Sequence, residues 1–204
     1  MPPSDAYNQV ESLVKRYRAL SNAARRSYNE DNTRKDFILP LFRALEWNVE
    51  NTTEVSAEEK VSRGSVDFAF RLDGIPRFFL ETKRMSEGLT KPDWVRQAID
   101  YAWTKGVPWA LLSDFEGLRV FNAEWKEDQP VRAQFLEFSI DTYLPDIERL
   151  WWLSRSQIAA GTLGTEAEKV GKRPKKEPVT ARLFDDLKTW RRELFRHLKP
   201  YNKA

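Results

Sequence analysis

The sequence of 204 residues contains no cysteine and a single histidine, His197. Without cysteine there is no disulfide framework, no thiolate zinc site and no cysteine nucleophile. A lone histidine near the C-terminus also argues against a Ser-His-Asp triad, a histidine-based nuclease and a two-histidine metal site. If the protein is an enzyme, its chemistry must therefore come from carboxylates, lysine, arginine, glutamine or tyrosine.

Glycine and long apolar runs are also scarce. The 8 glycines form neither G-x-G-x-x-G nor G-x-x-x-x-G-K-[ST], so nucleotide binding by either loop is unsupported. No apolar stretch approaches the roughly 20 residues needed to cross a bilayer. The first residues lack the charged-then-apolar order of a signal peptide. We expect a cytoplasmic protein that makes no contact with membranes.

Aromatic residues, in contrast, are plentiful. The chain has 12 Phe and 8 Trp within a hydrophobic content of 41%, which is enough for a packed core. The net charge of +3 is unevenly spread, because residues 160–204 hold 12 basic and 6 acidic side chains and the remainder is slightly acidic. We predict a main domain at 1–158, a basic linker at 159–180 that is rich in charge, Gly and Pro, and an amphipathic helical segment at 181–204.

Hydrophobic spacing within the main domain predicts helices that alternate with strand hairpins. The turn L-D-G-I-P at 72–76 favours a hairpin of 66–72 with 77–83. Pro40 lies inside a helical stripe and predicts a kink or a late helix start. This order of elements is typical of an α/β fold with a mixed β-sheet flanked by helices. The expected helices are 6–26, 37–45, 92–105 and 143–158, and the other expected strands are 109–113, 118–125 and 135–140.

Asp67, Glu81 and Lys83 form the combination with the clearest chemical use. Asp67 alternates with apolar neighbours on one strand of the hairpin, and Glu81 and Lys83 share one face of the other strand. Two carboxylates can hold Mg²⁺, with waters completing its octahedron. A lysine can position the attacking water and stabilise developing negative charge. The pattern indicates metal-assisted hydrolysis of a phosphate ester.

A second set of the same type competes with the first. Asp114 precedes a predicted strand that ends in Glu124 and Lys126. The surroundings favour the first set, because the helix after it carries Gln97 and Tyr101 four residues apart, hence on one side of that helix. No comparable pair follows Lys126. Glu30, just before the kinked helix, is a further candidate for contact with the metal.

Eight short segments match a known family, at residues 30–34, 38–41, 45–47, 65–67, 81–84, 97–102, 109–113 and 119–121. Together, residues 28–123 resemble the PD-(D/E)XK nucleases at the N-terminus of restriction enzymes, namely the type I motor subunit and the single-chain type IIG restriction–modification enzymes. Glu46 departs from the usual glycine but leaves the catalytic set untouched. The family's D and E-x-K fall on Asp67, Glu81 and Lys83, its Q-x-x-x-Y on Gln97 and Tyr101, and its helical glutamate on Glu30.

The resemblance implies that 1–158 is a nuclease domain with a restriction-endonuclease-like core. Asp67, Glu81 and Glu30 would hold Mg²⁺, or alternatively Mn²⁺, and the substrate would be double-stranded DNA. One such site cuts one strand, so a double-strand break needs two events or two copies, for example in a dimer. The enzyme class would be type II (IIG-like) or type I restriction endodeoxyribonuclease.

The C-terminal part carries a resemblance of its own. Residues 150–163 and 184–202, with the linker between them, resemble the start of the helical connector that leads to a methyltransferase domain. Methyltransferase and target-recognition domains, in the same chain or another, are the implied partners. S-adenosylmethionine would be a cofactor only if a methyltransferase domain follows. The alternative function is a nuclease fold that has become a non-catalytic DNA-binding or docking module, against which the intact Asp67, Glu81 and Lys83 argue.

Overall fold

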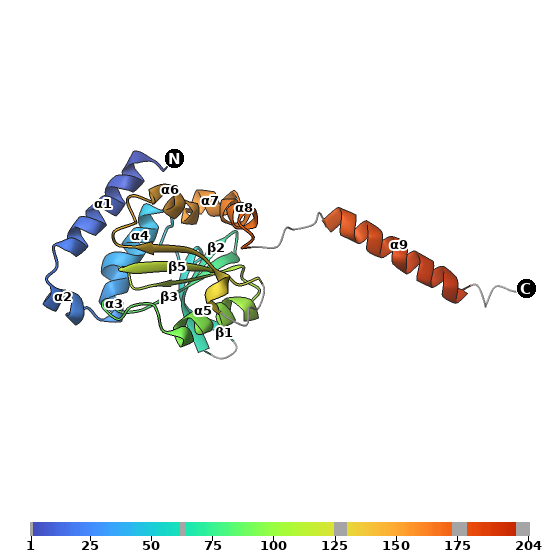
Figure 1. The fold of residues 1–204 in the computed structure, drawn as a ribbon, viewed down its shortest axis with the longest axis horizontal. Coiled ribbons are helices and arrows are strands. Elements are labelled where there is room, and N and C mark those ends of the chain that lie inside the picture. Colours follow the sequence, from blue (N-terminus) through green and yellow to red (C-terminus); the bar gives the residue numbers. More distant parts are fainter. Residues whose placement is uncertain (1, 62–63, 125–129, 173–178, 199–204) are drawn as a thin grey trace, which may run out of the picture. The chain divides into compact units, whose positions relative to one another are not determined.

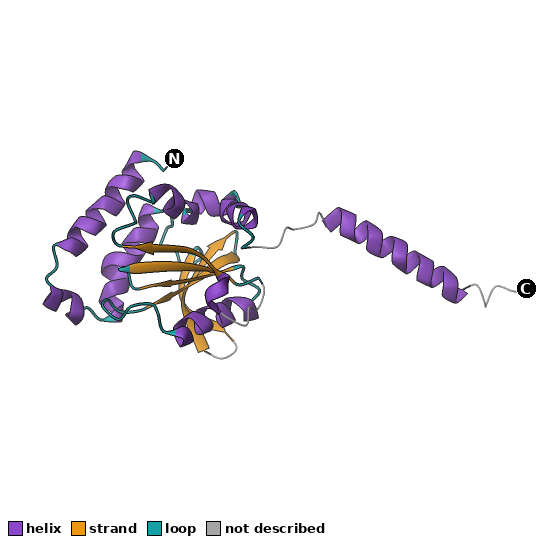
Figure 2. Cartoon of the chain, in the orientation of Figure 1, coloured by secondary structure: helices purple, strands orange, loops and turns teal. Residues whose placement is uncertain are grey.

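A computed structural model describes residues 2–61, 64–124, 130–172 and 179–198. The chain divides into two units, Met1–Arg173 and Pro174–Ala204. The first unit is built on a six-stranded sheet whose strands lie side by side in sequence order (Figures 1 and 2). These strands are β1 (Val55–Val61), β2 (Gly64–Leu72), β3 (Ile75–Thr82), β4 (Trp109–Ser113), β5 (Gly117–Asn122) and β6 (Gln134–Ser139).

One strand pair makes this sheet mixed. All neighbouring strands are antiparallel except β3 and β4, which are parallel. A parallel pair needs a crossover connection, and helix α5 (Pro92–Thr104) provides it. The C-terminal ends of β3 and β4 therefore meet at one edge of the sheet, where the Lys83 amide donates to the Ser113 carbonyl at 2.9 Å. The predicted α/β class, with a mixed sheet flanked by helices, is confirmed. The predicted hairpin of 66–72 with 77–83 is confirmed as well.

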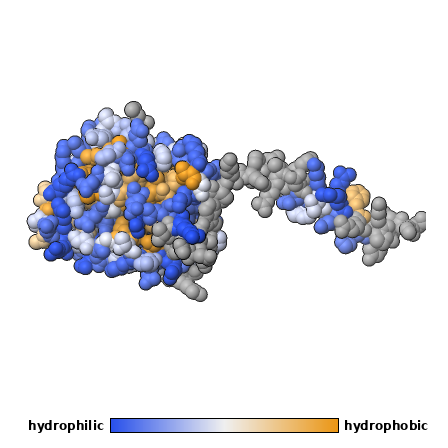
Figure 3. All heavy atoms as spheres, viewed as in Figure 1, coloured by the Kyte–Doolittle hydropathy of each residue, from blue (hydrophilic) through white to orange (hydrophobic). Residues whose placement is uncertain are grey.

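Helices cover both faces of the sheet. On one face, α5 buries Val95, Ala98 and Ala102 against the strands. On the other, α1 (Ser4–Arg18) and α4 (Leu39–Ala44) pack over an aromatic core. There the Phe70 and Phe78 rings stack with centroids 4.3 Å apart. Hydrophilic residues cover most of the face of this unit that Figure 3 shows, with smaller hydrophobic areas between them.

The helical segment around Pro40 contains a wide turn. Three segments follow one another without a break: α3 (Glu30–Thr33), the π-helix η1 (Arg34–Ile38) and α4. Proline removes one helical hydrogen bond, the one to the carbonyl four residues earlier. That carbonyl belongs to Asp36 and accepts instead from Arg16 Nη1 at 3.1 Å. The predicted irregularity at Pro40 is thus present as a π-turn just before it.

Two predicted helices are wrong in their extent, because polar residues interrupt them. The 6–26 helix is two helices, α1 and α2 (Asn22–Ser27), and the Ser21 hydroxyl caps α2 by accepting from the Ala24 amide at 3.1 Å. The 143–158 helix is likewise broken, and Ser154 caps its last part. Its pieces are α6 (Ile147–Leu150), the 3-10 turn η3 (Trp151–Leu153) and α7 (Arg155–Ala159).

The predicted linker at 159–180 also requires correction. Its first half forms α8 (Thr162–Lys169), which buries Leu163, Gly164 and Ala167 against the body. Gly164 lacks a side chain and Ala167 has a small one, which allows this close packing although the segment is mostly polar. Residues 173–178 lie outside the described residues.

The second unit contains one described helix, α9 (Val179–Leu198). It confirms the predicted C-terminal helical extension, and Leu187, Trp190, Leu194 and Phe195 are exposed on it. Among the described residues, no helix is long and apolar enough to cross a membrane.

Candidate active site

Asp67 lies where β2 and β3 separate. The paired positions of these strands end at Phe68 and Leu80. Beyond them, the carboxylate of Asp67 takes over the role of a backbone acceptor. Its Oδ2 accepts from the Thr82 amide at 2.7 Å and from the Thr82 hydroxyl at 2.6 Å. Two hydrogen bonds on one oxygen fix the orientation of this side chain, which is 18% exposed.

Arg34, at the start of the π-turn, joins the N-terminal helices to this hairpin. Its Nη2 lies 2.6 Å from Asp67 Oδ1 and also donates to Glu30 Oε1. Its Nε donates to the Thr82 hydroxyl at 2.6 Å. A weaker contact of 3.4 Å reaches Asp31, which is 86% exposed. The same nitrogen of Arg34 thus contacts the carboxylates of both Glu30 and Asp67.

Glu81 and Lys83 stand next to this group at the end of β3. Lys83 Nζ donates to Glu81 Oε1 at 2.8 Å. Both side chains are largely enclosed, with exposures of 5% for Glu81 and 13% for Lys83. The second carboxylate oxygen of Glu81, Oε2, is buried and has no hydrogen-bond partner among the residues that the structure describes. A buried carboxylate oxygen that lacks a donor is costly, and such atoms call for an explanation.

Gln97 and Tyr101 approach Glu81 from α5. Gln97 Nε2 donates to Glu81 Oε1 and to the Tyr101 hydroxyl, both at 3.3 Å. The Tyr101 hydroxyl in turn lies against the backbone of Gly64, where an added Cβ would come within 2.6 Å of it. Gly64 also has a φ of +144°, which favours glycine. The first residue of β2 thus leaves room for the tyrosine that supports Gln97.

The carboxylates influence one another electrostatically. Burial raises the pKa of Glu81, and the nearby charge of Asp67 raises it further, while Lys83 opposes both. Burial likewise raises the pKa of Glu30, with Arg34 lowering it and Asp67 raising it again. Carboxylates that repel each other across a partly closed site favour any cation that can lie between them.

All six residues predicted from the sequence lie in this region. The structure brings them together in two neighbouring sets, one held by Arg34 and one by Lys83. The two sets interact electrostatically, because the charge of Asp67 raises the pKa of Glu81. Arg34 and Thr82 are not among the residues predicted from the sequence. The four-residue spacing from Glu30 to Arg34 could have suggested their ion pair. Nothing in the local pattern points to the contact between Thr82 and Asp67.

Two carboxylates suit a magnesium ion, which keeps several waters and binds through one or two protein carboxylates. Asp67 and Glu81 are such a pair, and the unpartnered Oε2 of Glu81 gives an ion a free ligand atom. Glu30 does not complete a set of three with them, although Arg34 Nη2 contacts both Glu30 and Asp67. Within the described part of the chain, no group of three or more Asp, Glu, His or Cys side chains has the arrangement of a metal site.

The competing set is not assembled. Asp114 follows β4 at the edge where Lys83 lies, and Glu124 follows β5 at the opposite edge, because these strands are antiparallel. Five residues of strand, or about 16 Å, separate the two ends. Lys126 lies outside the described residues. Asp114 has a local role instead, since its Oδ1 accepts from the Gly117 amide at 2.8 Å in the turn between β4 and β5.

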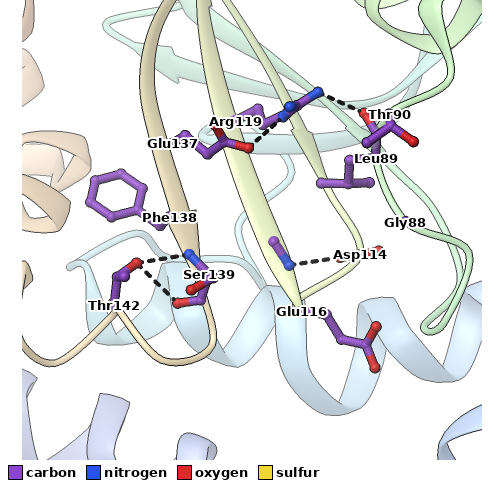
Figure 4. A pocket seen from close by; sticks show the side chains of 11 residues that line it. Gly88, Leu89, Thr90, Asp114, Glu116, Arg119, Glu137, Phe138, Ser139 and Thr142 are labelled. Atoms are coloured by element: carbon purple, nitrogen blue, oxygen red, sulfur yellow. Dashed lines mark hydrogen bonds and ion pairs between the residues drawn. The ribbon is translucent and has the colours of Figure 1, made fainter.

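A hollow of about 430 Å³ lies beside this turn, between β5, β6 and residues 88–90. Arg119 crosses it, donating from Nε to Glu137 and from Nη1 to the Leu89 carbonyl, both at 2.9 Å (Figure 4). Asp114 lines the hollow, and burial raises its pKa to about 6. The polar groups of the hollow are thus largely occupied with one another.

Asp114→Asn should stabilise the protein at neutral pH. The folded state holds the proton more tightly than the unfolded state, whose carboxyl titrates near 3.8. Wild type therefore loses stability as pH rises from about 4 to about 6, by at most about 3 kcal/mol. Asparagine can still accept from Gly117 and carries no charge. Urea unfolding at pH 4 and pH 8 should show the gain only at pH 8, and an equal gain at both would contradict this origin.

No family model matches the chain. Over 130 residues the sequence is 30% identical to the type II restriction enzyme and methyltransferase RM.Eco57I of Escherichia coli. The match covers 56% of this chain and 13% of that protein, so the chain spans a small part of its relative. The resemblance to restriction enzymes predicted from the motifs is confirmed by this similarity.

A solved structure, that of the type IIG restriction endonuclease BpuSI, also matches. It is aligned over 78% of this chain and 20% of its own, with a TM-score of 0.44 and 17% sequence identity.

Proposed function

We propose that residues 1–158 form the nuclease domain of a restriction–modification enzyme and hydrolyse phosphodiester bonds of double-stranded DNA with Mg²⁺. The observation that best supports this proposal is the buried environment of the Glu81 carboxylate. Its side chain is 5% exposed, it lies near the Asp67 carboxylate, and its Oε2 has no donor. A folded protein rarely keeps so unfavourable a group unless the group serves a ligand or a reaction.

Glu81 Oε2 would bind the ion because it lacks a donor, and Asp67 Oδ1 would bind it in place of its contact with Arg34. Asp67 Oδ2 and Glu81 Oε1 are already hydrogen-bonded to Thr82 and Lys83. When bound, Mg²⁺ lowers the pKa of a water and neutralises charge on the scissile phosphate. Mn²⁺ has the same ligand preferences and should replace it. We assign Glu30 an auxiliary contact with the ion or its waters.

The remaining residues have distinct tasks at the reacting phosphate. Lys83 uses one of its three donors on Glu81 and retains the others for the attacking water and a phosphate oxygen. Gln97 donates both amide hydrogens, one to Glu81 and one to Tyr101, and so fixes the orientation of the Glu81 carboxylate. The Tyr101 hydroxyl accepts that bond and keeps its own hydrogen, which a DNA phosphate oxygen can accept.

Sequence recognition should lie outside this domain, because phosphate contacts position a protein on DNA without reading bases. The relative's printed name includes a methyltransferase, and we propose that methyltransferase and target-recognition domains act together with this chain. S-adenosylmethionine would then be a cofactor of that partner. Type IIG-like organisation fits this relative better than type I. Two copies, or two events, would produce a double-strand break, and the activity implies a cytoplasmic location.

Asp67→Asn tests the proposal. The substitution keeps the shape and the acceptor for Thr82 but removes the charge that an ion needs. Nicking of supercoiled plasmid in Mg²⁺ buffer should fall by about a hundredfold or more. Asp141→Asn is the matched control, since Asp141 is 78% exposed and pairs only with Arg18 among the contacts found. Undiminished nicking by Asp67→Asn would reject the assignment and favour the non-catalytic docking module.

A further inference from the structure

Arg34 is the counter-ion of the predicted metal ligands. Three carboxylates, those of Glu30, Asp67 and Glu81, face two cations, Arg34 and Lys83. The carboxylates outnumber the cations, which favours a further cation in the site. Arg34 therefore does not neutralise the site, and it occupies one particular part of it.

That part is Oδ1 of Asp67, the oxygen that Thr82 does not contact. Thr82 already gives Oδ2 two hydrogen bonds, so Oδ1 is the atom left for an ion, and Arg34 Nη2 lies 2.6 Å from it. An ion bound at the usual distance of about 2.1 Å from Oδ1 would come within about 4 Å of the guanidinium. Like charges this close in a site shielded from water repel strongly. The Arg34–Asp67 contact therefore competes with a bound ion for this oxygen.

Arg34 has a second ion-pair partner, Asp31, toward which it can move when it leaves Asp67. Its weak contact with Asp31 runs to an exposed carboxylate on the solvent side of the same helical segment. Moving toward Asp31 would also free Glu30, the third predicted ligand, from the same nitrogen Nη2. One displacement thus makes two carboxylates available together.

We propose that Arg34 is a positioning residue that gates the metal site: it holds Asp67 and Glu30 in the absence of metal, and a divalent ion must displace it in order to bind. This inference rests on the proposed function and adds a regulatory step to the same site. It predicts that the ion binds more tightly when Arg34 is removed. If Arg34 only held Asp67 in the orientation that binds metal, its removal would weaken binding instead.

The test is calorimetric titration of the purified chain with Mn²⁺ in the absence of DNA. Arg34→Gln should lower the Kd for Mn²⁺ by about tenfold, as expected when one charged competitor is lost. Arg34→Lys keeps the charge without the forked geometry and should lower it by a smaller factor. Arg84→Gln is the matched control: it removes a nearby arginine that pairs with Glu87 and makes no described contact with Glu30, Asp67 or Glu81, so its Kd should stay near wild type.

The outcomes separate this inference from the proposed function. Tighter binding in Arg34→Gln but not in Arg84→Gln supports the gate. Unchanged or weaker binding in both Arg34 variants, with wild-type binding abolished by Asp67→Asn, overturns the gate alone. Wild-type binding that is absent, or indifferent to Asp67→Asn, overturns both. Thermal denaturation with and without Mn²⁺ gives a second readout, and the upward shift in Tm should be largest in Arg34→Gln.

Discussion

Replacing Lys83 with methionine is expected to slow DNA cleavage by about 10²–10³-fold, the usual cost of removing one charge-stabilising donor from an active site. Methionine has nearly the same length, so the space beside Glu81 and Trp94 stays filled. The Lys83 ammonium lies 5.5 Å from the Trp94 ring centroid. The measurement is the single-turnover nicking rate in Mg²⁺ buffer.

The loss should also depend on pH. Lys83 lowers the pKa of Glu81 by its hydrogen bond and its charge, against burial and the Asp67 charge, which raise it. Without Lys83 the carboxyl keeps its proton to higher pH, and the protonated form binds metal poorly. The deficit of Lys83→Met should therefore shrink as pH rises. A deficit of constant size across pH would mean that Lys83 acts only on the water and the phosphate.

Lys91→Met is the control for this experiment. Lys91 lies 4.1 Å from the same Trp94 ring centroid, so it is a neighbouring cation of the same type. It makes no described contact with Asp67 or Glu81, and its replacement should change the rate only a few-fold through DNA binding. Equal losses in the two variants would assign the effect of Lys83 to general charge rather than to its position.

Trp47→Ala should destabilise the protein by about 3–5 kcal/mol, the range for large aromatic side chains in a packed core. Trp47 is 1% exposed, and its indole N–H donates to the Leu153 carbonyl at 2.9 Å. Its ring meets Phe70 and Phe78 edge-on, at 5.2 and 5.3 Å between centroids. The substitution removes these contacts and leaves a buried carbonyl unpaired. Urea unfolding followed by circular dichroism measures the loss.

Trp103→Ala is the matched comparison, because Trp103 is 44% exposed. Its loss should change stability by less than about 0.5 kcal/mol. Phe70 and Phe78 lie on the two strands that carry Asp67 and Glu81, so a loosened core should also reduce metal affinity in Trp47→Ala. Equal stabilities for the two variants would show that the contact between Trp47 and Leu153 contributes little to the fold.

Much of the site follows from local pattern in the sequence. The hairpin turn at 72–76 sets which face Asp67, Glu81 and Lys83 occupy, and helical spacing pairs Gln97 with Tyr101. These features are short-range, so period and turn chemistry are enough to predict them. The strand order beyond the hairpin required the structure, since no local signal says that β3 and β4 run parallel.

What sequence reasoning missed depends on contacts between distant residues. β1 is rich in polar residues, and exposed Ala57 and Glu58 give it no hydrophobic alternation, so its pairing with β2 could not be foreseen. The Arg34–Thr82 contact joins positions 48 residues apart. The helix α8 was hidden by a composition typical of linkers, although Leu163 and Ala167 are spaced four apart on its buried side.

The single parallel strand pair has a consequence for the order of folding. Contacts within the β2–β3 hairpin close a short loop and can form early, whereas pairing of β3 with β4 must wait for the α5 crossover. Gln97 reaches Glu81 only when that crossover is in place, and Arg34 reaches Asp67 only when the N-terminal helices dock. A partly synthesised chain would thus carry the carboxylates without the contacts that orient them. The proposed nuclease activity should therefore require both the α5 crossover and the docked N-terminal helices.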